Sequence, residues 1–470
     1  MTLSLAKPHL LIVPVSAVAL AYAAVYLDTK LILAAILTVL FIGLITKQPV
    51  IGIYLLAWFL PFERIGSVDV AGVTIRISQI IAIITLVIWI ARGFILNKFK
   101  LRPYPIGIPI GLFVMISVLS MINTPNVERS LLVLTFTLFT IGVSIALPNM
   151  VRQQRQVLVI IQVLLISASL VSLFGMFQFV GDIIGLPTSL TGLREQYTKD
   201  ILGFPRVQAT ALEPLYFANY LLIPFSIALT LLLSKARDFK PLYLLGVVAL
   251  SAVNIILTVS RGGYIAWAAV LLALGVYYFK ALLRPRMIIA LVSIAVVVLV
   301  ITARFLNITE QIKTFKLHVT NVFDGASYVE RVETFSLAYD MWLEHPWIGY
   351  GPGSFGPYAA LHPLQAPPEG YKIVNNEYIE LLAETGVLGL AAFGIVIMSL
   401  LIRSWKALRY GTHQELKAIL VGLVMAFIGI LVQYNTFSVL YIMHIWFVIG
   451  MLMAVQNLLL YAPPTPQRSS

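Results

Sequence analysis

Three arginines stand where their side chains could bind an anionic ligand. Arg206 and Arg331 lie in the two longest hydrophilic segments, and Arg261 lies between two apolar stretches, in the Ser-Arg-Gly-Gly run 260–263. A guanidinium binds phosphate through two parallel N–H donors and stays charged at physiological pH. Three of them together would bind a pyrophosphate. The alternative is that each is an interfacial anchor whose side chain extends toward lipid headgroups.

The residues around Arg261 fit an anion site. Ser260 is the predicted N-cap of the helix that follows, whose N-terminal amides and dipole favour a negative charge. Gly262 and Gly263 carry no side chain, so we expect them to let a bulky ligand approach the backbone.

A second group of candidate residues begins at Asn375. On a helix, Glu377, Glu380 and Glu384 stand at positions i, i+3 and i+7 and share one broad face. Carboxylates there could deprotonate a hydroxyl or orient a sugar. The alternative is a solvated helix start, where the helix dipole favours acidic residues.

The composition defines what must position these residues. The chain has 470 residues, of which 60% are hydrophobic and only 11% charged, whereas soluble domains have about 25% charged residues. A soluble protein and a nucleic-acid binder are both excluded, despite the net charge of +12. The sequence predicts an all-α polytopic membrane protein with about 12–14 transmembrane helices. The apolar stretches are 10–26 (interpreted as a retained helix), 31–46, 50–62, 77–95, 105–122, 131–148, 157–180, 215–234, 242–259, 262–280, 287–304, 386–402, 418–433 and 438–460.

Loop charge predicts the orientation. The loops on one side, with both termini, hold 19 of the 32 basic residues and two of the 20 acidic ones, a net charge of +17, against −5 on the other side. The positive-inside rule then places both termini in the cytoplasm.

Two outer loops are long, 181–213 and 305–378. The second is predicted to be partly helical: a capping box at Ser327 starts a helix that runs to about Glu344, and His345-Pro346 ends it. Gly349, Gly351, Gly353 and Gly356 follow in a turn-rich stretch.

Few charges interrupt the apolar stretches, which disfavours a proton-coupled transporter. The polar residues within them are predicted to form interhelical hydrogen bonds; these are Gln162, Gln178, Asn219, Asn254, Gln433 and His444. There is no cysteine, and the histidines of the large loop are scattered, so we expect no metal site and no cofactor.

Taken together, the motifs resemble the O-antigen ligase and polymerase superfamily of bacterial envelope glycan assembly. The resemblance covers roughly 200–400 and keeps the family's order. Its pieces are Arg206 with Thr210 and Glu213-Pro214, Ser260–Gly263, Ser327 with Arg331, His345–Phe355, and Asn376 with Tyr378, Glu384 and Gly386. We therefore divide the chain into N-terminal transmembrane helices (1–180), an O-antigen ligase-like catalytic region (181–404), and C-terminal helices with a cytoplasmic tail (405–470).

The resemblance implies a GT-C-like fold and a metal-independent, inverting glycosyltransferase in the cytoplasmic membrane, with its site on the outer face. The donor would be a polyprenyl pyrophosphate-linked oligosaccharide, and the acceptor a glycan or glycolipid hydroxyl; membrane lipid is a further partner. It assigns pyrophosphate binding to Arg206, Arg261 and Arg331, and makes Asn376, Tyr378 and His362 further substrate-binding candidates.

The sequence departs from the family at Asn375, where the ligases carry a histidine. An amide cannot act as a general base. Glu377, Glu213 and His362 are the remaining candidates, unless this branch uses weaker base assistance. The departure leaves polymerisation, one repeat unit onto another, as an alternative to ligation. A small-solute transporter for inorganic carbon and a non-catalytic envelope protein are further alternatives.

Overall fold

A computed structural model describes residues 39–64, 67–70, 73–96, 104–279, 326–361 and 371–461, and over these the chain is almost entirely helical. Within these residues, seven helices are long and apolar enough to cross a membrane: α4 (Ile77–Ile95), α6 (Val127–Met150), α7 (Gln154–Ile183), α10 (Pro214–Ser234), α18 (Glu377–Tyr410), α19 (Gln414–Gln433) and α20 (Met443–Tyr461). Shorter apolar helices are α3 (Val50–Phe59), α5 (Gly107–Ser120), α11 (Pro241–Leu257) and α12 (Arg261–Tyr277). The prediction of an all-α polytopic membrane protein is confirmed. The apolar stretches at 10–26 and 287–304, and most of 31–46, lie outside the described residues.

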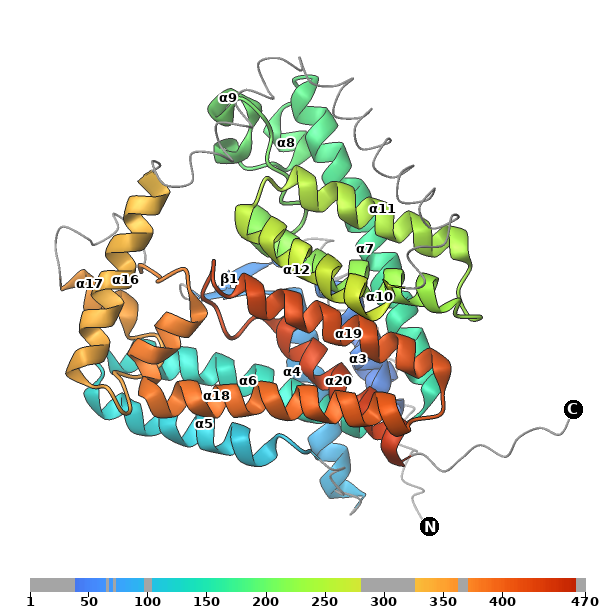
Figure 1. Cartoon of the computed structure of the whole chain (residues 1–470), viewed down its shortest axis with the longest axis horizontal. Helices are drawn as coiled ribbons and strands as arrows, with labels where there is room; N and C mark the ends of the chain where they lie inside the picture. The colour runs from blue at the N-terminus through green and yellow to red at the C-terminus, as the bar shows by residue number, and fades with distance from the viewer. Residues whose placement is uncertain are drawn as a thin grey trace, which may run out of the picture.

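The helices form two packed groups (Figure 1). In one group, α10 packs against α11, α12 and α19; in the other, α18 packs against α5 and α20, and α20 packs against α6. Contacts between α19 and α20 join the two groups. The helices α10 and α20 are the most buried of the long helices, because each is surrounded by the others of its group.

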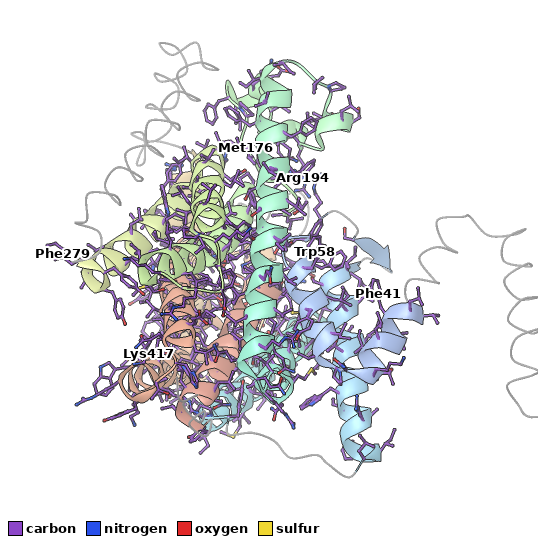
Figure 2. All side chains as sticks on the ribbon, turned by 90° about the vertical axis from the view of Figure 1, so that its right-hand side faces the viewer. Phe41, Trp58, Met176, Arg194, Phe279 and Lys417 are labelled. Carbon is purple, nitrogen blue, oxygen red and sulfur yellow. The ribbon has the colours of Figure 1, made fainter. Side chains whose placement is uncertain are left out.

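The long helix α7 lies between the N-terminal helices and the first group (Figure 2). It contacts α3 and α11. The Ser167 hydroxyl of α7 donates a hydrogen bond of 2.6 Å to the carbonyl oxygen of Trp58 in α3. Trp58 lies in the last turn of α3, where carbonyl groups lack an intrahelical donor. The Ser167 hydroxyl therefore satisfies a helix-end carbonyl and holds α3 against α7.

Short elements connect the long helices. They comprise the antiparallel hairpin of β1 (Val68–Val70) and β2 (Val73–Ile75), the turns α8 (Thr188–Thr191), η2 (Glu195–Tyr197) and α9 (Lys199–Leu202), the 3-10 turn η1 (Met121–Asn123), and the loop helices α16 (Ala326–Glu344) and α17 (Phe355–Ala360). The helix α16 ends at Glu344, as the following His-Pro pair predicts. It packs on α18, and its Met341 shares a small apolar cluster with Phe355 and Ala383.

Two predicted boundaries are wrong. The last apolar stretch becomes helical only at Met443, so residues 434–442 form a loop between α19 and α20, which we name the 434–442 loop. Apolar side chains there pack inward without a helix, which a hydropathy pattern cannot distinguish from a span. The helix α18 starts before its apolar stretch and is kinked at Gly386, whose φ is +65°. A Cβ at Gly386 would lie 2.3 Å from the carbonyl carbon of Trp347, so only glycine permits this approach.

Candidate functional site

The structure places Arg206 beside the start of α12. Its backbone N–H donates to the Tyr197 carbonyl over 2.8 Å, its Nε donates to the Thr258 carbonyl over 3.3 Å, and its guanidinium lies 5.7 Å from the centre of the Tyr197 ring. Burial lowers the pKa of Arg206, and the charge of Arg261 lowers it further, while Tyr197 and Glu213 act in the opposite direction. Two arginines predicted from separate motifs therefore lie within electrostatic range of each other.

Arg331 reaches the same region through the 434–442 loop. Its Nη2 donates to the carbonyl oxygen of Thr436 over 3.4 Å. Thr436 in turn packs against the first turn of α12, where a Cβ added to Gly262 would lie 2.1 Å from its Oγ1. The three predicted arginines thus gather at one end of the bundle, around the N-terminus of α12.

The capping prediction for α12 is confirmed, because the Ser260 Oγ accepts a hydrogen bond of 3.2 Å from the Gly263 N–H. The expectation that the two glycines admit a ligand is wrong. Gly262 faces Thr436, and a Cβ on Gly263 would lie 2.7 Å from the Cβ of Ala218. Protein atoms fill the space on both glycines, so their role is close packing of the helix start.

Glu213 lies immediately before α10 and does not cap it. Burial raises the pKa of Glu213, while the charges of Arg194 and Arg206 lower it. Glu213 therefore partly offsets the charge of Arg206. A competing anion such as phosphate would have to overcome this partner.

A buried polar network supports the segment before Glu213. Glu63 accepts a hydrogen bond of 3.4 Å from the Leu212 N–H, and its Oε1 lies 3.8 Å from the His444 Nδ1. The His444 Nε2 is 2.7 Å from the Asn219 Oδ1, and the Asn219 Nδ2 donates to the Gln433 Oε1 over 2.9 Å. For Asn219, Gln433 and His444, the predicted interhelical hydrogen bonds are confirmed.

The glutamates of α18 lie in a separate pocket. Glu377, Glu380 and Glu384 all line it, as their predicted common helix face requires. Side chains of α5 and α6 form the apolar wall, and residues Ser438–Tyr441 of the 434–442 loop close one side. The arginines described above are not among the residues that line this pocket.

Hydrogen bonding distinguishes the three carboxylates. The Glu384 oxygens accept from the N–H groups of Gly353 (2.8 Å) and Phe355 (3.1 Å) in the glycine-rich stretch. Glu380 accepts from the Val374 N–H (3.0 Å) and the Ser438 hydroxyl. Glu377 is 3% exposed, and its carboxylate has no hydrogen-bond donor among the described residues. Glu377 is therefore the carboxylate with vacant acceptor positions.

The neighbouring candidates have backbone contacts. The Asn376 Oδ1 caps α18 by accepting from the Tyr378 and Ile379 N–H groups (3.1 and 3.2 Å), and the Tyr378 hydroxyl donates to the Leu431 carbonyl over 2.7 Å. Asn375 adopts a φ of +60°, and its N–H donates to the Ser438 Oγ over 3.1 Å. None of these side chains lines the glutamate pocket. His362 lies outside the described residues.

Sequence reasoning missed Arg129 and the 434–442 loop. Arg129, in the first turn of α6, lines the pocket within electrostatic range of Glu380 and Glu384, and lies 4.9 Å from the centre of the Tyr371 ring. Tyr441, from the loop, lines the same pocket. One sequence signal could have found Arg129: it is a basic residue on the predicted outer side, where acidic residues predominate.

Part of the chain that contains most of these site residues matches a known protein family. Residues 246–394 match the family model described as O-antigen ligase. The matched segment contains Arg261, Arg331 and all three glutamates; Arg206 lies before it. The match confirms the predicted resemblance to the O-antigen ligase and polymerase superfamily and supports a role in membrane glycan assembly. No curated protein matches the chain.

Proposed function

We propose that this protein transfers a glycan from a polyprenyl pyrophosphate donor to an acceptor hydroxyl, as an O-antigen ligase does, without a metal ion. One observation carries the proposal: Arg206 lies within electrostatic range of Arg261, and Thr436 connects Arg331 to the same helix start. Guanidinium groups gathered in one region are suited to a pyrophosphate, because each can donate two parallel hydrogen bonds to a phosphate. We place this site on the outer face of the cytoplasmic membrane, with both termini in the cytoplasm.

In the proposed reaction the acceptor oxygen attacks the anomeric carbon of the donor sugar from the face opposite the pyrophosphate. The bond from the anomeric carbon to the pyrophosphate oxygen breaks, so the configuration inverts. The leaving pyrophosphate takes the bonding electrons, and the arginines stabilise its charge. The acceptor proton passes to a carboxylate.

Glu377 is the proposed general base. Its carboxylate is buried in the pocket without a donor among the described residues, whereas Glu380 and Glu384 are each occupied by two donors. Glu213 has a different place in the proposal, as the counter-charge of Arg206. We keep 181–404 as the catalytic region, to which Arg129 and the 434–442 loop contribute from outside.

A polymerase is the second candidate, and Asn375 favours it. This residue stands where the ligases have a histidine, and its amide cannot accept the proton. Its backbone N–H is used to hold Ser438. A site without the ligase histidine fits an acceptor that is another repeat unit.

The decisive experiment is incubation of the purified protein, in lipid nanodiscs, with a polyprenyl pyrophosphate-linked oligosaccharide. A ladder of products on a gel would identify a polymerase, and a single shifted band with an added glycolipid acceptor would identify a ligase. Absence of transfer under both conditions, from protein that remains monodisperse, would contradict the proposed function.

A further inference from the structure

The glutamate pocket is built to hold a polar ligand. Two of its lining residues carry a polar group without a hydrogen-bond partner among the described residues: the carboxylate of Glu377, which is 3% exposed, and the buried Nε of Arg129. A buried polar group that lacks a partner costs free energy, and ligand sites are where such groups are retained. The pocket lining therefore holds one unsatisfied donor and one unsatisfied acceptor.

The pocket lies apart from Arg206, Arg261 and Arg331, but the 434–442 loop contacts both regions. The 434–442 loop presents Thr436 to Gly262 and Arg331, and presents Ser438 and Tyr441 to the pocket. Glu377 stands next to this loop, since its N–H donates to the Tyr434 carbonyl over 2.8 Å. A donor pyrophosphate on the arginines would thus leave the pocket for the second reactant.

The charges of the pocket restrict that reactant. The described lining residues include three carboxylates, Glu377, Glu380 and Glu384, and one guanidinium, Arg129. Arg129 already lies within electrostatic range of Glu380 and Glu384. A carboxylate on the ligand would therefore lose its hydration and meet like charges, whereas sugar hydroxyls can donate to the glutamates.

We propose that the pocket is the acceptor-sugar subsite, and that it selects a neutral sugar over a uronic acid, with Arg129 donating to a sugar oxygen. This inference rests on the proposed function. Phe113 and Val133, on the opposite wall, offer the apolar surface against which a sugar's C–H face packs.

The chain has no cysteine, so a single introduced thiol reports occupancy. In Val439→Cys the thiol is on the pocket wall; in the matched control Asn435→Cys it is on an exposed part of the same loop. The probes are methyl glucoside, galactoside and mannoside and their three uronide counterparts, which differ only in the C6 carboxylate. Maleimide labelling is measured with the protein in nanodiscs.

Neutral methyl hexosides should slow the labelling of Val439→Cys and leave Asn435→Cys unchanged, and the uronides should protect neither. Adding Arg129→Gln, or Arg129→Lys to keep the charge, should abolish the protection, because loss of a hydrogen bond from a charged donor lowers affinity about tenfold or more.

Protection by uronides equal to that by hexosides, or no protection by any sugar, would overturn the inference. Labelling needs no donor and no turnover, so failed protection with intact glycan transfer rejects the subsite alone. Intact protection without transfer rejects the proposed function alone.

Discussion

The backbone N–H of Glu377 donates a hydrogen bond of 2.8 Å to the carbonyl oxygen of Tyr434. The contact joins the first residue of α18 to the loop that follows α19. Thr436, two residues further on, accepts from Arg331 and packs on Gly262. The 434–442 loop therefore sets the position of the proposed base, Glu377, relative to Arg331 and to the start of α12, where Arg261 lies.

Replacing Arg206, Arg261 or Arg331 by alanine should abolish glycan transfer and leave the protein folded. Losing one charge-assisted contact to a partly desolvated phosphate costs about 2–4 kcal/mol, or about 30- to 1,000-fold in rate. Lysine should restore only part of the rate, since it lacks the planar pair of donors. Initial rates and gel filtration in detergent measure the two effects. Arg409→Ala is the control, because Arg409 lies in the last turn of α18, at the end of that helix opposite Glu377. Full activity in all three alanine variants would reduce these arginines to interfacial anchors.

Among the glutamates of α18, Glu377→Gln should reduce kcat most, because it removes the carboxylate that has vacant acceptor positions. Glu384→Gln should act mainly on stability, since Glu384 holds the N–H groups of Gly353 and Phe355. Single-turnover rates measure the effect on catalysis, and thermal unfolding in detergent measures the effect on stability. An active Glu377→Gln would exclude this residue as the base.

The matched test of the family's histidine is Asn375→His. Asn375 has a φ of +60°, and asparagine and histidine are among the non-glycine residues that most often tolerate this region. We therefore expect the variant to fold. A higher transfer rate in Asn375→His, together with an active Glu377→Gln, would mean that this branch has no dedicated base at its carboxylates.

Glu213 should make donor affinity depend on pH. Burial raises the pKa of Glu213 above its usual value, so protonation begins at higher pH than for an exposed glutamate. Below the raised pKa the Glu213 carboxyl is neutral, so Arg206 can bind the donor phosphate. Above that pKa the Glu213 carboxylate competes with the phosphate for Arg206. The donor KM should rise as pH rises through this range, and should be lower and flatter in Glu213→Gln. If Glu213→Gln instead loses kcat at unchanged KM, Glu213 is the base.

Transfer should survive treatment with EDTA. The Glu380 and Glu384 carboxylates already accept protein N–H and O–H donors, and the donor substrate carries its own leaving group. Activity is measured after chelation and again after Mg²⁺ or Mn²⁺ is added. A loss that either ion restores would reveal a metal requirement.

The orientation can be measured with single cysteines at exposed positions. Gln196→Cys, at the end of the bundle that holds the arginines, should react in intact cells with a membrane-impermeant thiol reagent; Thr412→Cys, between α18 and α19, should not. The reason is the asymmetry of loop charge. Labelling at Thr412→Cys alone would move the proposed site to the cytoplasmic face.

The sequence alone determined the class of fold and the two groups of candidate residues. Apolar stretches long enough to cross a bilayer are sufficient for helices, because a lipid-exposed backbone must satisfy its own hydrogen bonds. Local spacing also sufficed for the Ser260 cap and for the common face of Glu377, Glu380 and Glu384, since both are short-range properties of a helix.

Only the tertiary structure decided how these groups relate. Glu377, Glu380 and Glu384 have the same residue type and nearly the same local setting, and what separates them is donors from distant segments, such as Gly353 and Ser438. Arg129 and the 434–442 loop join the site through packing between helices far apart in the sequence. Periodicity carries no information on such contacts, because a side chain's partners across a helix interface depend on the three-dimensional packing of the whole bundle.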